Sequence, residues 1–107
     1  MIQFPNATLH RYSLFENGRG VYGETVTEYV YVDEITVDFQ NENNVEIAKD
    51  YGVELQNLYK IYVDLNTPLL DTDQLRDDKG HTYHILGNIK EYDHFHHYKK
   101  AHLARER

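Results

Sequence analysis

The residues best suited to bind a metal ion lie close together near the C-terminus. His94 and His96 are two positions apart, so on a strand both side chains would lie on one face and could supply two ligands to a divalent ion. Histidines beside lysines are more often exposed surface or contact residues, and catalytic zinc usually draws ligands from distant chain positions as well. We therefore expect these histidines at a surface, and we predict no bound metal and no other cofactor.

Residues for nucleophilic or acid–base catalysis are present, but they lack the spacing that such chemistry needs. The single serine, Ser13, has no elbow motif around it, and the chain has no glycine-rich phosphate loop. There is no cysteine, which excludes a thiol nucleophile, a disulfide and an iron–sulfur cluster. The aspartates of residues 71–78 are typical of turns. We predict that the protein is not an enzyme.

Charge is sorted along the chain rather than spread evenly. Residues 1–20 carry a net charge of +1, residues 21–78 have 14 acidic and 3 basic groups for −11, and residues 79–107 have 6 basic and 3 acidic groups for +3, which sum to the total of −7. An acidic middle repels duplex phosphates, so sequence-specific DNA binding is not expected. The basic, histidine-rich tail of residues 93–107 could instead contact an acidic partner.

The 107 residues predict a single domain over residues 1–107 that is made mainly of β-strands. Runs rich in tyrosine and β-branched residues cover 8–15, 20–32, 35–39, 58–65, a segment ending near Arg76, a segment from His81 and 95–103. We predict a small rolled β-barrel or sandwich of about six or seven strands, with one short helix or loop insertion. No apolar run reaches the roughly 18 to 20 residues that a membrane helix needs.

The insertion is expected over residues 41–57, where the period of two is lost. Asn43 or Asn44 could cap a short helix through Ala48 and Lys49, and Gly52 would end it. An ordered loop is the alternative for this segment.

Tyrosine is unusually frequent, with ten copies against four phenylalanines and no tryptophan. In the run 20–32 neither parity is purely polar, which predicts a strand that packs on both sides or contacts another subunit. Tyrosine is also enriched at protein interfaces. We therefore assign the candidate interface residues to this run and to the basic end of the chain: Tyr29, Tyr31, Tyr98, Lys99, Lys100 and Arg105.

The order of these elements resembles that of the head-closure proteins of long-tailed bacteriophages. The resemblance is carried by the hairpin ENGRGVYGE, the strand ITVDF, the insertion NVEIAKDYG, the strand LYKIYVD, and the unit D-x-L-x-D-D-K-G-x-x-Y-x-I-x-G from Asp73 to Gly87. Proteins of this family are also called stopper, head-completion or minor capsid proteins. The histidine-rich, basic ending departs from the family pattern.

The resemblance implies a structural protein of the virion neck, made in the host cytoplasm. Such a protein forms a ring, expected to be a dodecamer, below the portal and adaptor proteins and above the tail terminator or other tail proteins. It seals the DNA exit channel after packaging and provides the surface on which the tail docks. The insertion of residues 41–57 would face the channel, where Glu42, Glu46, Asp50 and Glu54 would repel DNA without reading its sequence.

Two other interpretations remain open from the sequence. One is a different neck or tail component, either an adaptor, which should be mainly helical, or a tail terminator, which should lack the channel insertion. The other is a small metal-binding β-domain, which zinc titration by calorimetry would detect. Under the leading interpretation the C-terminal tail contacts neighbours, so deletion of residues 93–107 should abolish assembly and leave the barrel folded.

Overall fold

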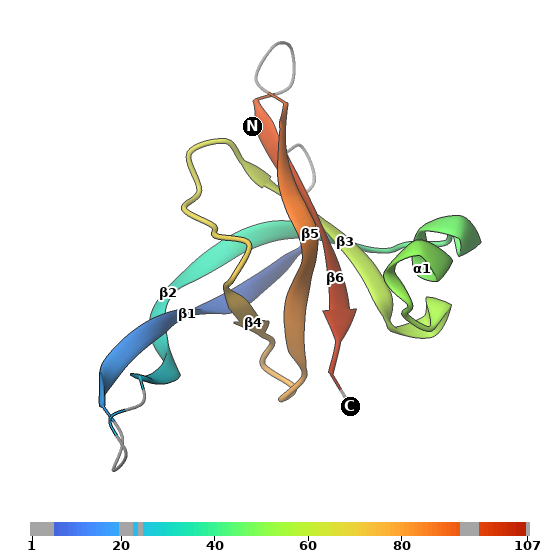
Figure 1. The fold of residues 1–107 in the computed structure, drawn as a ribbon. Coiled ribbons are helices and arrows are strands. Elements are labelled where there is room, and N and C mark those ends of the chain that lie inside the picture. The colour runs from blue at the N-terminus through green and yellow to red at the C-terminus, as the bar shows by residue number, and fades with distance from the viewer. Residues whose placement is uncertain (1–5, 20–22, 24, 93–96, 107) are drawn as a thin grey trace.

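The computed structural model describes residues 6–19, 23, 25–92 and 97–106, which form one closed β-barrel with a short helical insertion (Figure 1). Its elements are β1 (Ala7–Arg19), β2 (Thr25–Asn41), α1 (Val45–Tyr51), a 3₁₀ turn (Leu55–Asn57), β3 (Leu58–Asp64), β4 (Gln74–Arg76), β5 (Thr82–Tyr92) and β6 (Tyr98–Arg105). The predicted fold class is confirmed. Within this part of the chain no helix has the length and apolarity to cross a membrane.

The barrel is an antiparallel sheet in the order β1-β2-β3-β6-β5-β4, closed by pairing of β1 with β4. The closing contact is short and joins His10, Arg11 and Tyr12 to β4. The longest pairing is between β1 and β2, which runs from Ala7 opposite Val37 to Arg19 opposite Thr25. Because only the first half of β1 and the last part of β2 belong to the closed barrel, the rest of this pair extends beyond it.

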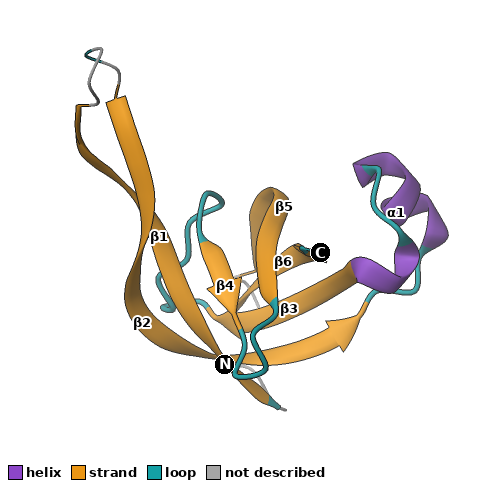
Figure 2. Ribbon diagram, turned by 90° about the horizontal axis from the view of Figure 1, so that it is seen from below, coloured by secondary structure: helices purple, strands orange, loops and turns teal. Residues whose placement is uncertain are grey.

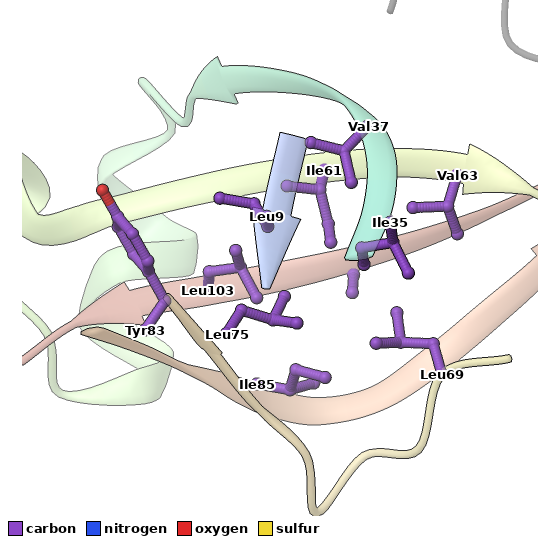
Figure 3. Close-up of a cluster of buried hydrophobic side chains, with 11 residues drawn as sticks. Leu9, Ile35, Val37, Ile61, Val63, Leu69, Leu75, Tyr83, Ile85 and Leu103 are labelled. Carbon is purple, nitrogen blue, oxygen red and sulfur yellow. The ribbon is translucent and has the colours of Figure 1, made fainter. Parts of the chain in front are cut away.

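The core fills the interior of the barrel with aliphatic side chains that alternate along each strand (Figure 3). Ile61 and Val63 of β3 are at most 1% exposed, while Lys60 and Tyr62 between and beside them lie on the outer face. The complete cluster is Leu9, Ile35, Val37, Ile61, Val63, Leu69, Leu75, Tyr83, Ile85, Ala101 and Leu103.

Residues 25–41 form one continuous strand rather than the two predicted separately for 20–32 and 35–39. The polar pair Asp33-Glu34 separates these two runs in the sequence. In the structure Asp33 lies opposite Arg11 and binds its guanidinium, so the strand continues through this point. The register shifts by one residue between Arg11 and Tyr12, a β-bulge that leaves Val32 without a directly opposed residue.

The insertion folds as the capping residues predict. The Asn44 side chain accepts hydrogen bonds from the backbone N–H groups of Glu46 and Ile47, so it is the N-cap of α1. Gly52 ends the helix in the left-handed conformation, with φ of 66°, and its N–H bonds back to the last turn. Of the two candidate caps, Asn44 is therefore the correct one.

The C-terminal segment is not a detachable tail. Residues 98–105 form β6, which pairs with β3 from Tyr98 to Ala104 and with β5 on its other side. Ala101 and Leu103 of this strand are in the core. The expectation that residues 93–107 can be deleted with the barrel left folded is wrong, because the deletion removes a strand that holds two others together.

Candidate functional site

A two-stranded arm projects from the barrel and consists of residues 12–19 of β1 and 25–32 of β2 (Figure 2). β4 pairs with β1 no further than Tyr12, and β3 pairs with β2 only from Asp38 onward. Among the described strands, therefore, each strand of the arm has one edge with no neighbour. Unpaired strand edges are templates on which another chain can pair.

The arm exposes apolar side chains on both of its faces. Leu14 lies opposite Tyr29 on one face, and Phe15 lies opposite Glu28 on the other. Phe15 and Tyr31 are about half exposed, at 51% and 50%. The exposed large apolar residues of the arm are Leu14, Phe15, Tyr29, Val30, Tyr31 and Val32. Exposed apolar side chains gathered on one element are typical of a protein–protein contact surface.

The arm is anchored at its root by a buried polar network. Asp73, whose side chain is fully buried, accepts hydrogen bonds from Arg11 Nη1 at 3.0 Å and from the Ser13 hydroxyl at 2.7 Å. The other side of the guanidinium donates to both carboxylate oxygens of Asp33, at 2.8 and 3.0 Å. The hydrogen bonds that Arg11 donates to Asp33 and Asp73 raise the pKa of Arg11 above its usual value, whereas burial acts to lower this pKa. Two strands and the β3–β4 connection are thereby joined.

Ring contacts continue this anchoring on the opposite face of the arm. The rings of Tyr12 and Tyr31 meet edge to face with centroids 5.6 Å apart, and the guanidinium of Arg76 lies 3.9 Å from the centre of the Tyr12 ring. The root of the arm is thus fixed, whereas the large apolar side chains described along it are 41–51% exposed.

A second cluster, at the β4–β5 turn, has the residue types for acid–base chemistry but the wrong electrostatics. Asp77 accepts bonds from the Tyr83 hydroxyl, the His81 ring, and the backbone N–H groups of His81 and Lys79. Burial raises the pKa of Asp77, but these bonds outweigh it and leave the pKa below 3.8. Burial and Asp77 raise the pKa of Tyr83 above 10.0. These shifts favour the charged form of Asp77 and the neutral form of Tyr83, as in ordinary surface residues. The cluster is best explained as a set of hydrogen bonds that stabilises the β4–β5 turn.

The metal-binding candidates receive no support from the described residues. His94 and His96 lie outside them. Across residues 6–19, 23, 25–92 and 97–106, no group of three or more histidine, aspartate or glutamate side chains is arranged to hold a metal ion.

Two of the predicted interface residues at the C-terminal end, Tyr98 and Lys100, lie on the outer face of β6. Ala101 and Leu103 of the same strand point into the core, so residues of the other parity point outward. Tyr29 and Tyr31, predicted with them, lie on the β2 strand of the arm, which is separated from β6 by β3 in the strand order. The structure therefore places the predicted interface residues on two separate surfaces.

The other two predicted interface residues have partners within the protomer. Lys99 is 14% exposed and donates to the carbonyl oxygen of Thr67 at 3.0 Å. Arg105 donates to the side-chain oxygen of Asn57 at 3.5 Å. Both cations therefore make contacts within the barrel, and their assignment to an interface stays a prediction.

The four acidic residues predicted to face a channel are also divided. Glu46, Asp50 and Glu54 are exposed on the insertion. Glu42 is 7% exposed, and its carboxylate lies 3.1 Å from the His102 ring nitrogen. Glu42 therefore does not belong to an exposed acidic set.

The arm's aliphatic residues and the partners of Asp73 were not identified from the sequence. The exposed aliphatic residues of the arm could have been predicted, because odd and even positions of the run 20–32 both carry apolar residues. No sequence signal pairs Arg11 with Asp73, since these residues are far apart in the chain and meet only when β1 and β4 close the barrel.

Comparison with known proteins relates the fold to a solved structure. No protein-family model matches the chain, and no curated protein sequence matches it. The solution structure of protein SF1141 from Shigella flexneri 2a superimposes with a TM-score of 0.72, over 94% of this chain and 91% of that chain, with 11% sequence identity. At this identity the likeness establishes the shared fold alone.

Proposed function

We propose that this protein is a structural subunit of the head-to-tail connector of a long-tailed phage, a stopper that forms a ring and closes the DNA exit channel. The observation that carries the proposal is the projecting arm, whose apolar side chains are about half exposed and whose outer strand edges pair with no other described strand. The order of the sequence elements supports the phage assignment, and the fold of a small barrel with an insertion after β2 agrees with it.

The energetics of the arm favour a role in assembly. A two-stranded hairpin by itself is at best marginally stable in water, so an arm of this length gains most from a neighbour that covers it. Burying the exposed half of side chains such as Phe15 and Tyr31 contributes roughly 1 kcal/mol each. Six such side chains supply several kcal/mol toward association, before the entropic cost of joining two molecules.

The insertion suits the wall of a DNA channel. Glu46, Asp50 and Glu54 are exposed on one short segment and repeat in every subunit of a ring. A ring of carboxylates repels phosphates, so DNA would stop at the closed channel without adhering to it. Portal and adaptor proteins on one side and tail proteins on the other are the partners that this role implies.

Electron microscopy of connector particles tests the proposal. Portal–adaptor complexes mixed with the protein should gain a ring of density at the tail side of the channel. A variant with Phe15→Asn and Val30→Asn on the arm should add no ring, whereas the control Val45→Thr, at a more exposed apolar position on α1, should add one. Wild-type mixtures without added density would refute the proposed function.

A further inference from the structure

A second surface of the molecule carries two adjacent lysines and three aromatic rings. It lies on the outer side of β3, β6 and β5, and we name it the Tyr–Lys face. It consists of Tyr62, Tyr92, Tyr98, Lys90 and Lys100. Strand register places Tyr62, Lys100 and Lys90 in one row across the three strands, with Tyr98 and Tyr92 in the adjacent row.

The three rings of the face form a continuous aromatic surface. Tyr92 and Tyr98 stack with centroids 4.9 Å apart, and Tyr62 meets Tyr98 edge to face at 5.4 Å. The ammonium group of Lys100 lies 5.7 Å from the centre of the Tyr62 ring. Tyr92 is 38% exposed, so the surface is open to a partner that combines apolar area with negative charge.

Lys90 and Lys100 are an unfavourable pair within the protomer. They lie directly opposite each other on β5 and β6, and like charges in this arrangement are destabilising. On the other face of the same two strands, Glu91 lies opposite Lys99 with 4.0 Å between the charged groups. Asp38 lies opposite Tyr62 and Asp64 lies opposite Tyr98, so two carboxylates border the β3 side of the face and its positive charge is concentrated at the Lys90–Lys100 pair on the β5–β6 side. An acidic partner relieves the repulsion between the two lysines.

The arm has the complementary composition. The arm, residues 12–19 and 25–32, includes Glu16 and Glu28 against Arg19, a net charge of −1. The same segment holds the apolar side chains that the protomer leaves exposed. Both requirements of the Tyr–Lys face, negative charge and apolar area, are therefore met by another part of this chain.

The two surfaces cannot meet within one copy. In the closed strand order β6 is three strands from β1 in either direction, so the arm leaves the barrel opposite the centre of the Tyr–Lys face. Figure 1 shows the arm and the described end of the β5–β6 pair pointing away from the barrel in different directions. We infer that the arm of one copy docks on the Tyr–Lys face of the next copy, an inference that rests on the proposed function and specifies its contact.

Such a contact joins two different surfaces, so each copy keeps one arm and one face free for further copies. Head-to-tail contacts of this kind close into rings when the rotation between copies allows it. Alternating tyrosines and lysines also suit a nucleic acid backbone, but the net charge of −7 and the acidic arm favour a protein partner.

Two charge-reversed variants test the contact. The arm variant carries Glu16→Lys and Glu28→Lys, and the face variant carries Lys90→Glu and Lys100→Glu. Each variant alone opposes like charges in the contact, so native mass spectrometry should show loss of the oligomers that wild type forms. An equimolar mixture restores both kinds of contact, positive arm with negative face and negative arm with positive face. The mixture should therefore recover oligomers made of alternating variants.

The controls separate this contact from its alternatives. Circular dichroism and thermal unfolding should match wild type for both variants, and Glu16→Gln with Glu28→Gln should weaken association less than reversal does. The inference is overturned if the face variant still associates alone, which indicates arm-to-arm pairing, or if mixing restores nothing. It is also overturned if wild type binds a duplex DNA oligonucleotide and only the face variant loses this binding. A wild type that stays monomeric at every concentration overturns it too, while the connector images decide the proposed function separately.

Discussion

Replacing Asp73 by alanine removes the acceptor at the centre of the network that anchors the arm. The Asp73 side chain is fully buried, and three groups donate to it: Arg11, the Ser13 hydroxyl and the backbone N–H of Leu70. After the substitution Arg11 keeps its two bonds to Asp33, so its charge stays partly compensated. The Ser13 hydroxyl and the Leu70 backbone N–H lose Asp73 as their acceptor.

The size of the effect follows from these contacts. Removing one member of a buried ion pair costs about 3–5 kcal/mol, and the remaining Asp33 bonds place this case at the lower end. The lost N–H bond adds roughly 1 kcal/mol, for a total of about 3–4 kcal/mol. A domain of this size is stable by about 5–15 kcal/mol, so the loss is a large share of it. The melting temperature should fall on the order of 12–30 °C.

Urea unfolding followed by circular dichroism measures the loss, with Asp33→Ala as the matched control. The Asp33 side chain is 37% exposed, so water replaces part of its role, and its removal should cost about 1–2 kcal/mol. Asp73→Asn keeps the shape and one acceptor oxygen and should fall between the two alanine variants. If Asp73→Ala costs no more than Asp33→Ala, the buried network does not anchor the arm in the way described.

Three further outcomes are expected. Gly87→Ala should destabilise the protein by about 1–2 kcal/mol, because Gly87 has φ of 64° and a Cβ there would lie 2.8 Å from the Tyr51 hydroxyl. Gly80→Ala is the control for backbone strain, because Gly80 has φ of 87° and its added Cβ would meet open space. Thermal unfolding should show a smaller loss of stability for Gly80→Ala than for Gly87→Ala. Burial raises the pKa of Glu42, but its hydrogen bonds outweigh this and hold the pKa below 4.5. The contribution of Glu42 to stability is therefore present above pH 4.5 and is lost as pH falls through the folded-state pKa. Glu42→Gln should reduce the dependence of the urea unfolding midpoint on pH in this range, and an unchanged dependence would contradict the stabilising role of the Glu42 carboxylate. Deleting residues 93–107 should give a chain without cooperative thermal unfolding, and a cooperative transition in that chain would show that β6 is dispensable.

Local features of the sequence were sufficient to predict the insertion and the main turn. The cap at Asn44 and the stop at Gly52 act through bonds to residues within four positions, so their chemistry can be recognised without the rest of the fold. Gly80, with φ of 87°, closes the turn that Asp77 and its neighbours indicate for the same reason.

The continuity of β2 and the role of β6 could not be predicted in this way. Asp33 looks like a break until Arg11 is placed opposite it, and the basic end looks like a tail until β3 and β5 pair on both of its sides. In each case the deciding contact joins residues that are distant in the chain. Strand pairing depends on such contacts, whereas capping and turn formation do not.

The amino-acid sequence by itself determined a small, mainly β protein with a capped helical insertion, because periodicity, capping and turn residues act over a few positions. Only the tertiary structure decided which charges are exposed. It buried Glu42 against His102, turned Lys99 inward and left Lys90 opposite Lys100. It also placed the predicted interface tyrosines on two separate surfaces, with Tyr29 and Tyr31 on the arm and Tyr98 on β6. The physical reason is that exposure and surface complementarity are properties of strand order and register, which are set by the closing of the whole barrel.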